Sequence, residues 1–118
     1  MKARRLPSAA AAAVVALAAL QAQAIQRGDP QAGAERADEC IACHGEGGNE
    51  PIDPTYPKIG GQHADYLMVM LERYRSGEIQ HEIMTNIAEA LSDREIRDLS
   101  AYFAAQDGDL HTPGRRLP

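Results

Sequence analysis

Two cysteines and a histidine stand together in the segment Cys40–His44, which reads Cys-Ile-Ala-Cys-His. Thiols separated by two residues form thioether bonds to the two vinyl groups of a haem, and the adjoining imidazole then reaches the iron from one side. The spacing therefore predicts that Cys40 and Cys43 hold one haem c covalently. It also predicts that His44 is an axial ligand of the iron.

The same two cysteines also admit a redox-active disulfide or half of a zinc site. A thioredoxin-like disulfide motif belongs to a βαβ unit, whereas the alanine-rich residues before Cys40 favour a helix. A structural zinc ion needs four ligands, and the chain has only these two cysteines. Haem attachment is the interpretation that fits the neighbouring histidine and the helical pattern.

The ligand on the other side of the iron decides whether the haem only passes electrons or also binds small molecules. Met70 lies on the apolar stripe of a predicted helix, where a methionine usually fills the core. Met84 follows the linker 78–83, from which a thioether can turn inward, so Met84 is the predicted sixth ligand. The remaining candidates are an open site and the side chains of Met68, His63, His81 and His111.

The N-terminal residues have the pattern of a secretion signal. Three basic residues precede a short run of Ala, Val and Leu, and small residues flank Gln23 at a cleavage-type site. The apolar run is too short to span a bilayer comfortably, which disfavours an uncleaved anchor. Residues 1–24 are therefore predicted to be a signal peptide, and residues 25–118 a single haem domain in the periplasm, with no membrane insertion of the mature chain.

Loss of that signal changes the charge balance of the chain. It removes three of the 12 Lys and Arg residues and none of the 17 Asp and Glu residues, which leaves a formal charge of −8. An acidic surface disfavours nucleic acid and anionic lipid as partners and favours redox proteins with basic docking patches. The mature 94 residues contain no Trp and one Phe, so we expect the haem to supply much of the core.

The residues outside the motif predict an all-α fold, with about four helices wrapped around the haem and no strand. Asp29 and Pro30 are a cap and a first-turn residue for a helix over 31–39, which delivers the cysteine motif at its end. The segment 45–57 is a loop, because Gly and Pro interrupt it repeatedly. A second helix is expected over 63–76, ended by a glycine.

A short helix is expected to begin near Met84, and the last helix has the best-marked start. The segment Ser92–Glu95 is a capping box, and the spacing of Asp93 and Arg97 predicts an ion pair along the outer side. The core face of this helix is formed by Ile96, Leu99 and Phe103. Residues 107–118, rich in Gly, Pro and charge, are expected to be a mobile tail.

The motifs together resemble the bacterial class I cytochromes c, most of all the single-haem relatives of the two-haem c-four type cytochromes. The resemblance implies that His44 and Met84 are the axial pair and that the carbonyl of Pro57 accepts a hydrogen bond from the imidazole of His44. It also implies that the first and last helices cross at Gly33, against Tyr102 or Phe103. The resemblance runs from about Gly33 to Gln106 and rests on the segments 40–45, 56–67, 84–88, 91–93 and 101–103.

The expected function is that of a periplasmic electron carrier, not an enzyme, which passes single electrons between redox partners by Fe(II)/Fe(III) cycling. The segment 76–84 also looks like the haem subunit of flavocytochrome c sulfide dehydrogenases, so a fixed subunit of a dehydrogenase complex is the alternative. A third hypothesis is a five-coordinate haem that binds a gas or acts as a peroxidase. Ile79 departs from the family, because a basic residue that could contact a haem propionate is common there.

Overall fold

The computed structural model describes residues 4–108 and 110, without the side chains of residues 19–26. Every regular element in these ranges is helical, so the predicted all-α fold is confirmed. In chain order the elements are α1 (Ala9–Arg27), α2 (Pro30–Arg36), α3 (Asp38–His44), the 3₁₀ helix η1 (Glu46–Gly48), α4 (Ala64–Arg75), α5 (Met84–Glu89) and α6 (Asp93–Ala104).

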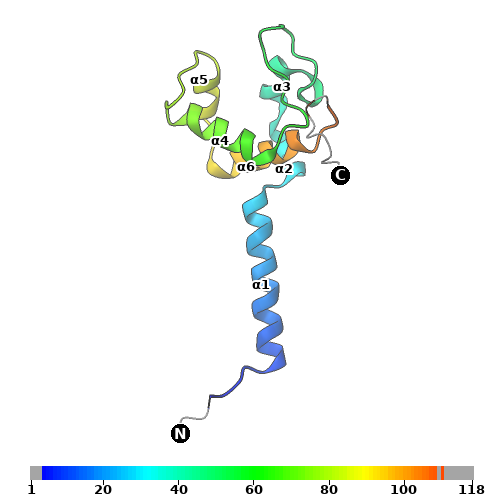
Figure 1. The fold of residues 1–118 in the computed structure, drawn as a ribbon, viewed down its shortest axis with the longest axis vertical. Helices are drawn as coiled ribbons and strands as arrows, with labels where there is room; N and C mark the ends of the chain where they lie inside the picture. Colours follow the sequence, from blue (N-terminus) through cyan, green and yellow to red (C-terminus); the bar gives the residue numbers. More distant parts are fainter. Residues whose placement is uncertain (1–3, 109, 111–118) are drawn as a thin grey trace, which may run out of the picture.

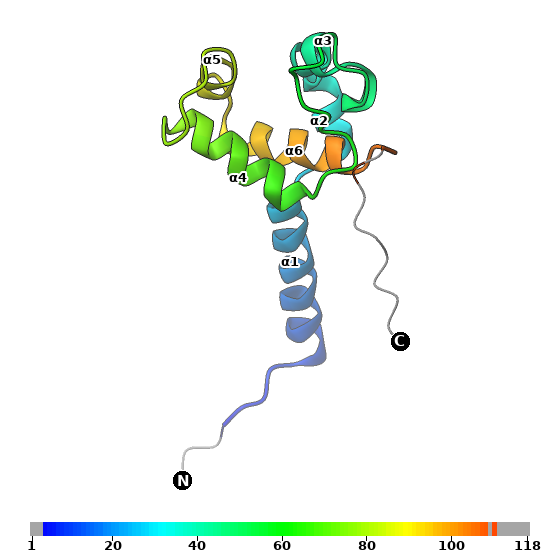
Figure 2. The same ribbon diagram turned by 45° about the horizontal axis from the view of Figure 1, so that its top comes forward.

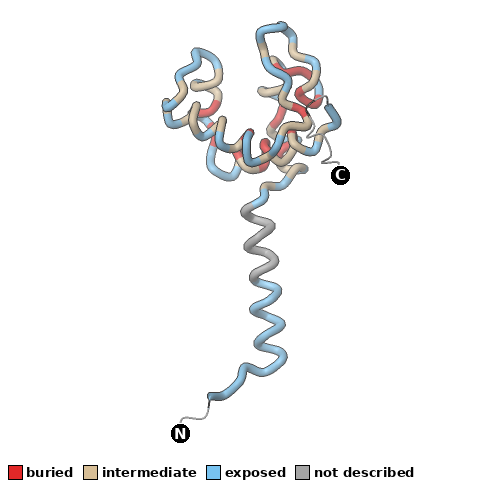
Figure 3. Tube along the Cα trace, viewed as in Figure 1, coloured by how far each residue is buried: buried red, intermediate tan, exposed pale blue. Residues whose placement is uncertain are grey.

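The helices α2 to α6 form a cup, in which α3 and α5 stand apart on opposite sides above α4 and α6 (Figure 1). The turned view in Figure 2 shows the same separation, so it is not an effect of projection. The buried stretches of the chain lie on the helices of the cup and in the glycine-rich loop after α3, and the described part of α1 is exposed (Figure 3).

α1 extends away from the cup in both views. None of the helices, over the residues that the structure describes, combines the length and the apolar character needed to cross a membrane. The signal peptide over residues 1–24 stays a prediction. Most of the predicted mobile tail, residues 109 and 111–118, lies outside the described residues.

The first predicted helix is divided into two, which corrects the expectation of one helix over 31–39. The Ala37 N–H bonds to the carbonyl of Ala34, three residues earlier, at 3.3 Å, and this tighter turn interrupts the α-helical ladder. Ala37 is fully buried at the break. As a result the cysteine motif lies within the separate helix α3 and does not follow the end of a longer one.

α2 and α6 cross closely at Gly33. A Cβ atom at this position would overlap the carbonyl of Asp98 and would lie 2.7 Å from the Cβ of Tyr102. Only a residue without a side chain fits between the two backbones, so the predicted crossing at Gly33 against Tyr102 is confirmed.

The start of α6 has the predicted capping box. Ser92 Oγ accepts from the Glu95 N–H at 3.2 Å, and Glu95 Oε2 accepts from the Ser92 N–H at 2.9 Å. The predicted pair between Asp93 and Arg97 is wrong, because the end of α4 brings Arg75 Nη2 to within 2.6 Å of the Asp93 carboxylate. Arg97 Nε is buried without a hydrogen-bond partner.

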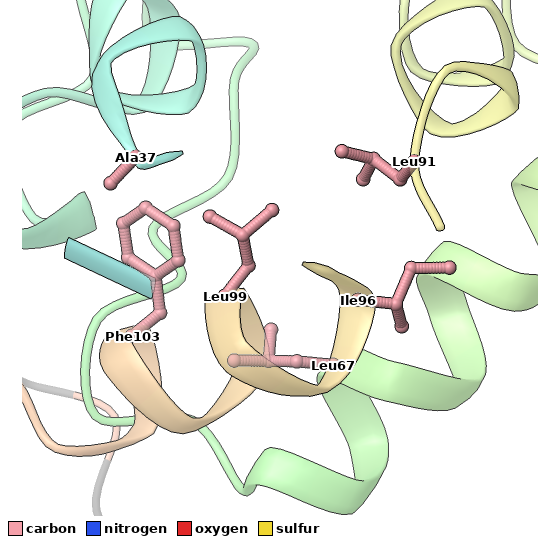
Figure 4. Packing of buried hydrophobic residues seen from close by; sticks show 6 residues of the cluster. All are labelled: Ala37, Leu67, Leu91, Ile96, Leu99 and Phe103. Atoms are coloured by element: carbon pink, nitrogen blue, oxygen red, sulfur yellow. The ribbon is translucent and has the colours of Figure 1, made fainter. Parts of the chain in front are cut away.

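The hydrophobic core is small and lies along α6. The predicted core face is confirmed, and Ile96 and Leu99 are the largest side chains that are fully buried. In Figure 4, Leu99 and Phe103 point from α6 towards the space that separates Ala37 on one side from Leu91 on the other. The buried apolar residues are Ala37, Leu67, Ala88, Leu91, Ile96, Leu99 and Phe103.

Candidate haem site

A cavity of about 370 Å³ lies between the two sides of the cup. One side, here called the motif wall, consists of Cys40, Cys43, His44 and Pro57, and the other, here called the methionine wall, consists of Met70, Leu71, Met84 and Ile87. α6, which lies below the two sides of the cup (Figure 1), contributes Leu99, Ser100 and Phe103 at the base. The cavity therefore brings the predicted haem-binding residues together with the predicted sixth ligand.

The motif wall is built by helix periodicity. Cys40, Cys43 and His44 occupy positions i, i+3 and i+4 of one helical run, and such positions share a face. Because α3 presents this face to the cavity, both thiols and the imidazole line the same space. The helix ends at Gly45, whose φ of +78° and ψ of 177° suit only glycine.

The ring of His44 is fixed by a hydrogen bond within the motif wall. Its side chain is 7% exposed, and Nδ1 lies 2.8 Å from the carbonyl oxygen of Pro57. Because a carbonyl oxygen only accepts, Nδ1 carries the proton and donates, which leaves the lone pair of Nε2 available to a metal. The loop that carries Pro57 is itself held to α3, since the Ile52 N–H donates to the Cys43 carbonyl at 3.1 Å.

The thiol of Cys40 is held in its neutral form. Burial, and then the nearby charge of Glu39, raise the pKa of the Cys40 thiol to about 11. A redox-active Cys-x-x-Cys motif requires a thiol with a lowered pKa, because the thiolate is the reactive species. Cys40 is therefore not the activated thiolate that such a motif needs.

The zinc alternative also finds little support in the site. Over the residues that the structure describes, no group of three or more His, Cys, Asp or Glu side chains is placed to hold a metal ion. The cavity lining is instead mainly apolar, with two thiols and one imidazole on one wall. That donor set fits a covalently attached haem.

The methionine wall has two thioethers. Met84 is the first residue of α5 and lines the cavity, as does Met70 from α4, and both are half-buried. Met68 packs against the hydrophobic core. His63 and His81 are exposed and are not among the described residues that line the cavity, while His111 lies outside the described residues.

Sequence reasoning missed a polar group at the base of the cavity. Ser100 Oγ is buried, has no hydrogen-bond partner, and belongs to a residue that lines the cavity. Buried hydroxyl groups are normally satisfied, so an unpaired one is consistent with a group that occupies the cavity in the loaded protein. Nothing in the sequence signalled this, because one serine on a helix is usually solvated.

The sequence profile of the family described as Cytochrome c matches residues 30–106, which includes all of α2 to α6. The chain belongs to the cytochrome c family. This membership implies a covalently bound haem c, and Cys40 and Cys43 fit its attachment site.

Individual relatives of this cytochrome agree with the profile. Cytochrome c4 of Thiocapsa roseopersicina is 43% identical over 99 residues, which cover 83% of this chain and 49% of the relative. A protein of Stutzerimonas stutzeri named thiosulfate dehydrogenase electron acceptor is 38% identical over 69 residues, which cover 56% of this chain and 32% of the relative.

The fold agrees with a solved structure as well. The crystal structure of reduced recombinant cytochrome c4 from Pseudomonas stutzeri superimposes with a TM-score of 0.64 at 34% identity, covering 69% of this chain and 47% of that chain. The class I cytochrome c fold predicted from the motifs is thereby confirmed. The chain spans about half the length of the cytochromes c4 that it matches.

Proposed function

We propose that this cytochrome is a periplasmic electron carrier with one haem c, attached to Cys40 and Cys43 and ligated by His44 and Met84. The observation that carries the proposal is the cavity itself, because His44 and Met84 line its opposite walls and the hydrogen bond of His44 uses Nδ1, which leaves Nε2 for the iron. When bound, the haem supplies reversible one-electron exchange between Fe(III) and Fe(II). With His44 and Met84 both bound to the iron, no position would be left there for a substrate.

Each wall has a distinct part in this role. The hydrogen bond from His44 Nδ1 to the Pro57 carbonyl fixes the ring and strengthens its donor nitrogen. A thioether on the other side favours the reduced state and raises the reduction potential. The apolar lining excludes water, which limits the reorganisation that accompanies each change of charge. The single pair of cysteines supports one haem for this chain.

The ligand assignment is tested with Met84→Ala, with Met70→Ala as its matched control, because both methionines line the cavity. Met84→Ala is expected to remove the weak long-wavelength absorption band of the sulfur-to-ferric-iron bond and to lower the reduction potential. Met70→Ala is expected to keep both. The reverse result would transfer the ligand role to Met70.

The five-coordinate alternative makes the opposite prediction for small ligands. A closed haem with two protein ligands is expected to bind carbon monoxide poorly in the ferrous state at neutral pH, whereas Met84→Ala is expected to bind it readily. Ready binding to the unaltered protein would overturn the assignment of Met84 and favour a gas-binding or peroxidase function.

The proposed partners are redox proteins with basic docking surfaces. The predicted mature chain has a formal charge of −8, and a relative is named as an electron acceptor of a dehydrogenase. Charge steering speeds encounters between oppositely charged partners and weakens as salt screens it. Electron-transfer rates with a basic redox protein are expected to fall as ionic strength rises, and a rate independent of salt would remove the steering argument.

Export to the periplasm is tested by the mass of the purified holoprotein. The cationic start and the apolar run support cleavage after Ala24, so the expected mass is that of residues 25–118 plus one haem. A mass that includes residues 1–24 would contradict the signal peptide.

A further inference from the structure

We propose that His81 is a positioning residue that holds Met84 at the iron by capping the turn that leads into α5. The inference rests on the proposed ligation by Met84. His81 was a candidate ligand from its type alone, but it is exposed and is not among the residues that line the cavity. Its ring is instead engaged with the backbone of the methionine wall.

The capping contacts are specific. The backbone N–H groups of Ile83 and Met84 both donate to Nδ1 of His81, each at 3.2 Å. The Thr85 N–H donates to the His81 carbonyl at 3.0 Å, so a helical turn already begins at His81. A side chain that accepts from the amides two and three residues ahead has the role of an N-cap, usually filled by Ser, Thr, Asp or Asn.

A second contact makes the cap reciprocal. Thr85 Oγ1 accepts from the His81 N–H at 2.9 Å and donates to the Ile79 carbonyl at 3.4 Å. This arrangement resembles a capping box, in which a side chain inside the helix returns to the amide of the cap residue. Side chains therefore bind the backbone at both ends of the linker 79–84: Thr85 binds the Ile79 carbonyl, and His81 binds the Met84 amide.

The imidazole is also held from α4. The rings of His81 and Tyr74 meet edge to face, with centroids 6.1 Å apart and an angle of 73° between the planes. Tyr74 is in the last turn of α4 and lines the cavity. This contact fixes the orientation of the ring whose Nδ1 binds the Met84 amide.

The cap is needed because α5 has six residues, and a helix this short is unstable without tertiary or capping contacts. Met84 is its first residue and lies in the turn that would fray first without the cap. Loss of the cap would increase the fraction of molecules in which the Met84 thioether has left the iron. An external ligand would then bind more tightly, because its apparent affinity scales with the population of the open state.

Two variants of the purified haem-loaded protein separate the acceptor from the ring. His81→Phe keeps a ring beside Tyr74 but has no acceptor, whereas His81→Asn keeps an acceptor at the matching atom and loses the ring. At one fixed pH, His81→Phe is expected to raise the apparent affinity of the ferric protein for imidazole about fivefold. His81→Asn is expected to stay within about twofold of the unaltered protein.

The sulfur-to-iron absorption band supplies a readout that a purely structural role would not move. It is expected to weaken in His81→Phe and to keep its strength in His81→Asn, while global unfolding temperatures differ little. Equal imidazole affinity in His81→Phe and the unaltered protein would overturn the proposal. Loosening in His81→Asn with none in His81→Phe would also overturn it, because loss of the ring contact with Tyr74 would then be the cause.

Failure of the ligand assignment is distinguishable from failure of this inference. An unaltered protein without the sulfur-to-iron band, together with an unchanged potential in Met84→Ala, would overturn both. A protein with the band that is lost in Met84→Ala, but with no response to His81→Phe, would overturn only the role of His81.

Discussion

The two walls of the cavity are held in place by different means. The motif wall is fixed by backbone contacts within a glycine-rich loop, and its histidine is 7% exposed and bonded to a carbonyl oxygen. The methionine wall depends on a six-residue helix, α5, whose first residue is half-buried and whose leading turn is capped by the exposed His81. The hydrogen bond that fixes His44 is partly buried, whereas the bonds that cap the turn before Met84 are exposed to solvent.

This difference matches the different demands that the proposed ligands place on the two walls. Covalent attachment and the proposed ligand His44 need one fixed geometry, and the backbone contacts of the motif wall provide it. A thioether bond to iron is weaker, and its retention depends on how well the protein positions the sulfur. If Met84 is the ligand as proposed, the methionine wall decides how firmly the sixth ligand is held, while the motif wall decides whether the haem is attached.

The largest expected effect is on haem attachment and folding, which should depend on the motif wall and not on the methionine wall. Replacing Cys40 and Cys43 together by Ser is expected to abolish covalent haem and cooperative unfolding, because the core without haem is small. Met84→Ala is expected to keep both. Absorbance of the denatured protein and thermal unfolding followed by circular dichroism measure the two properties. Cooperative folding of the double variant without haem would show that the helices need no cofactor.

The second expected effect compares two glycines with similar positive φ. A Cβ at Gly45 would overlap the carbonyl of Glu50 in the loop of the motif wall, whereas a Cβ at Gly77 meets nothing within 4 Å. Gly45→Ala is expected to cost about 3 kcal/mol or more in the free energy of unfolding, since overpacking adds to backbone strain. Gly77→Ala is expected to cost about 1 kcal/mol from strain alone. Equal losses in denaturant titrations would contradict the contrast.

A smaller effect is expected at acid pH, at the ion pair between Arg36 of α2 and Glu95 of α6. The amide and hydroxyl of Ser92, together with Arg36 at 2.9 Å, lower the pKa of Glu95 to about 2, from an ordinary value of 4.5. Because the folded-state pKa is the lower one, ionised Glu95 stabilises the fold above pH 4.5, and this contribution is lost as the pH falls towards 2.

Glu95→Gln tests that sign. The variant is expected to unfold at a lower temperature than the unaltered protein at neutral pH, and the gap between the two is expected to close between about pH 4.5 and about pH 2. A gap that stays constant with pH would show that lost packing, and not lost charge, causes the destabilisation.

The smallest effect is expected at the ion pair between Arg75 of α4 and Asp93 of α6. Arg75 bonds to the Leu91 carbonyl at 3.1 Å and to Asp93 at 2.6 Å, but Asp93 is 73% exposed. Arg75→Gln is expected to lower the free energy of unfolding by about 0.5 kcal/mol, because water and salt screen exposed pairs. A loss several times larger in denaturant titrations would mean that the bond to Leu91 holds the end of α5.

Several features were predictable because they depend on residues close in the chain. The capping box Ser92–Glu95 and the stripe of α6 follow from local spacing, and both are confirmed. The break at Ala37 was not predictable, since alanine favours continued helix and the interruption coincides with burial against other elements. The pairing of Asp93 with Arg75 was missed for the same reason, because residues 18 apart meet only through the packing of α4 on α6.

The candidate site likewise has some features that depend on neighbouring residues and others that depend on contacts between elements. The sequence by itself predicted the haem-attachment residues and their common face, because two thiols and an imidazole at spacings of three and four share one face of any helix that contains them. Only the tertiary structure decided that Met70 and Met84 both reach the cavity, that the Pro57 carbonyl meets His44, and that His81 turns to the Met84 amide. Those contacts arise between separate elements, and packing of the whole chain sets which side chains face inward.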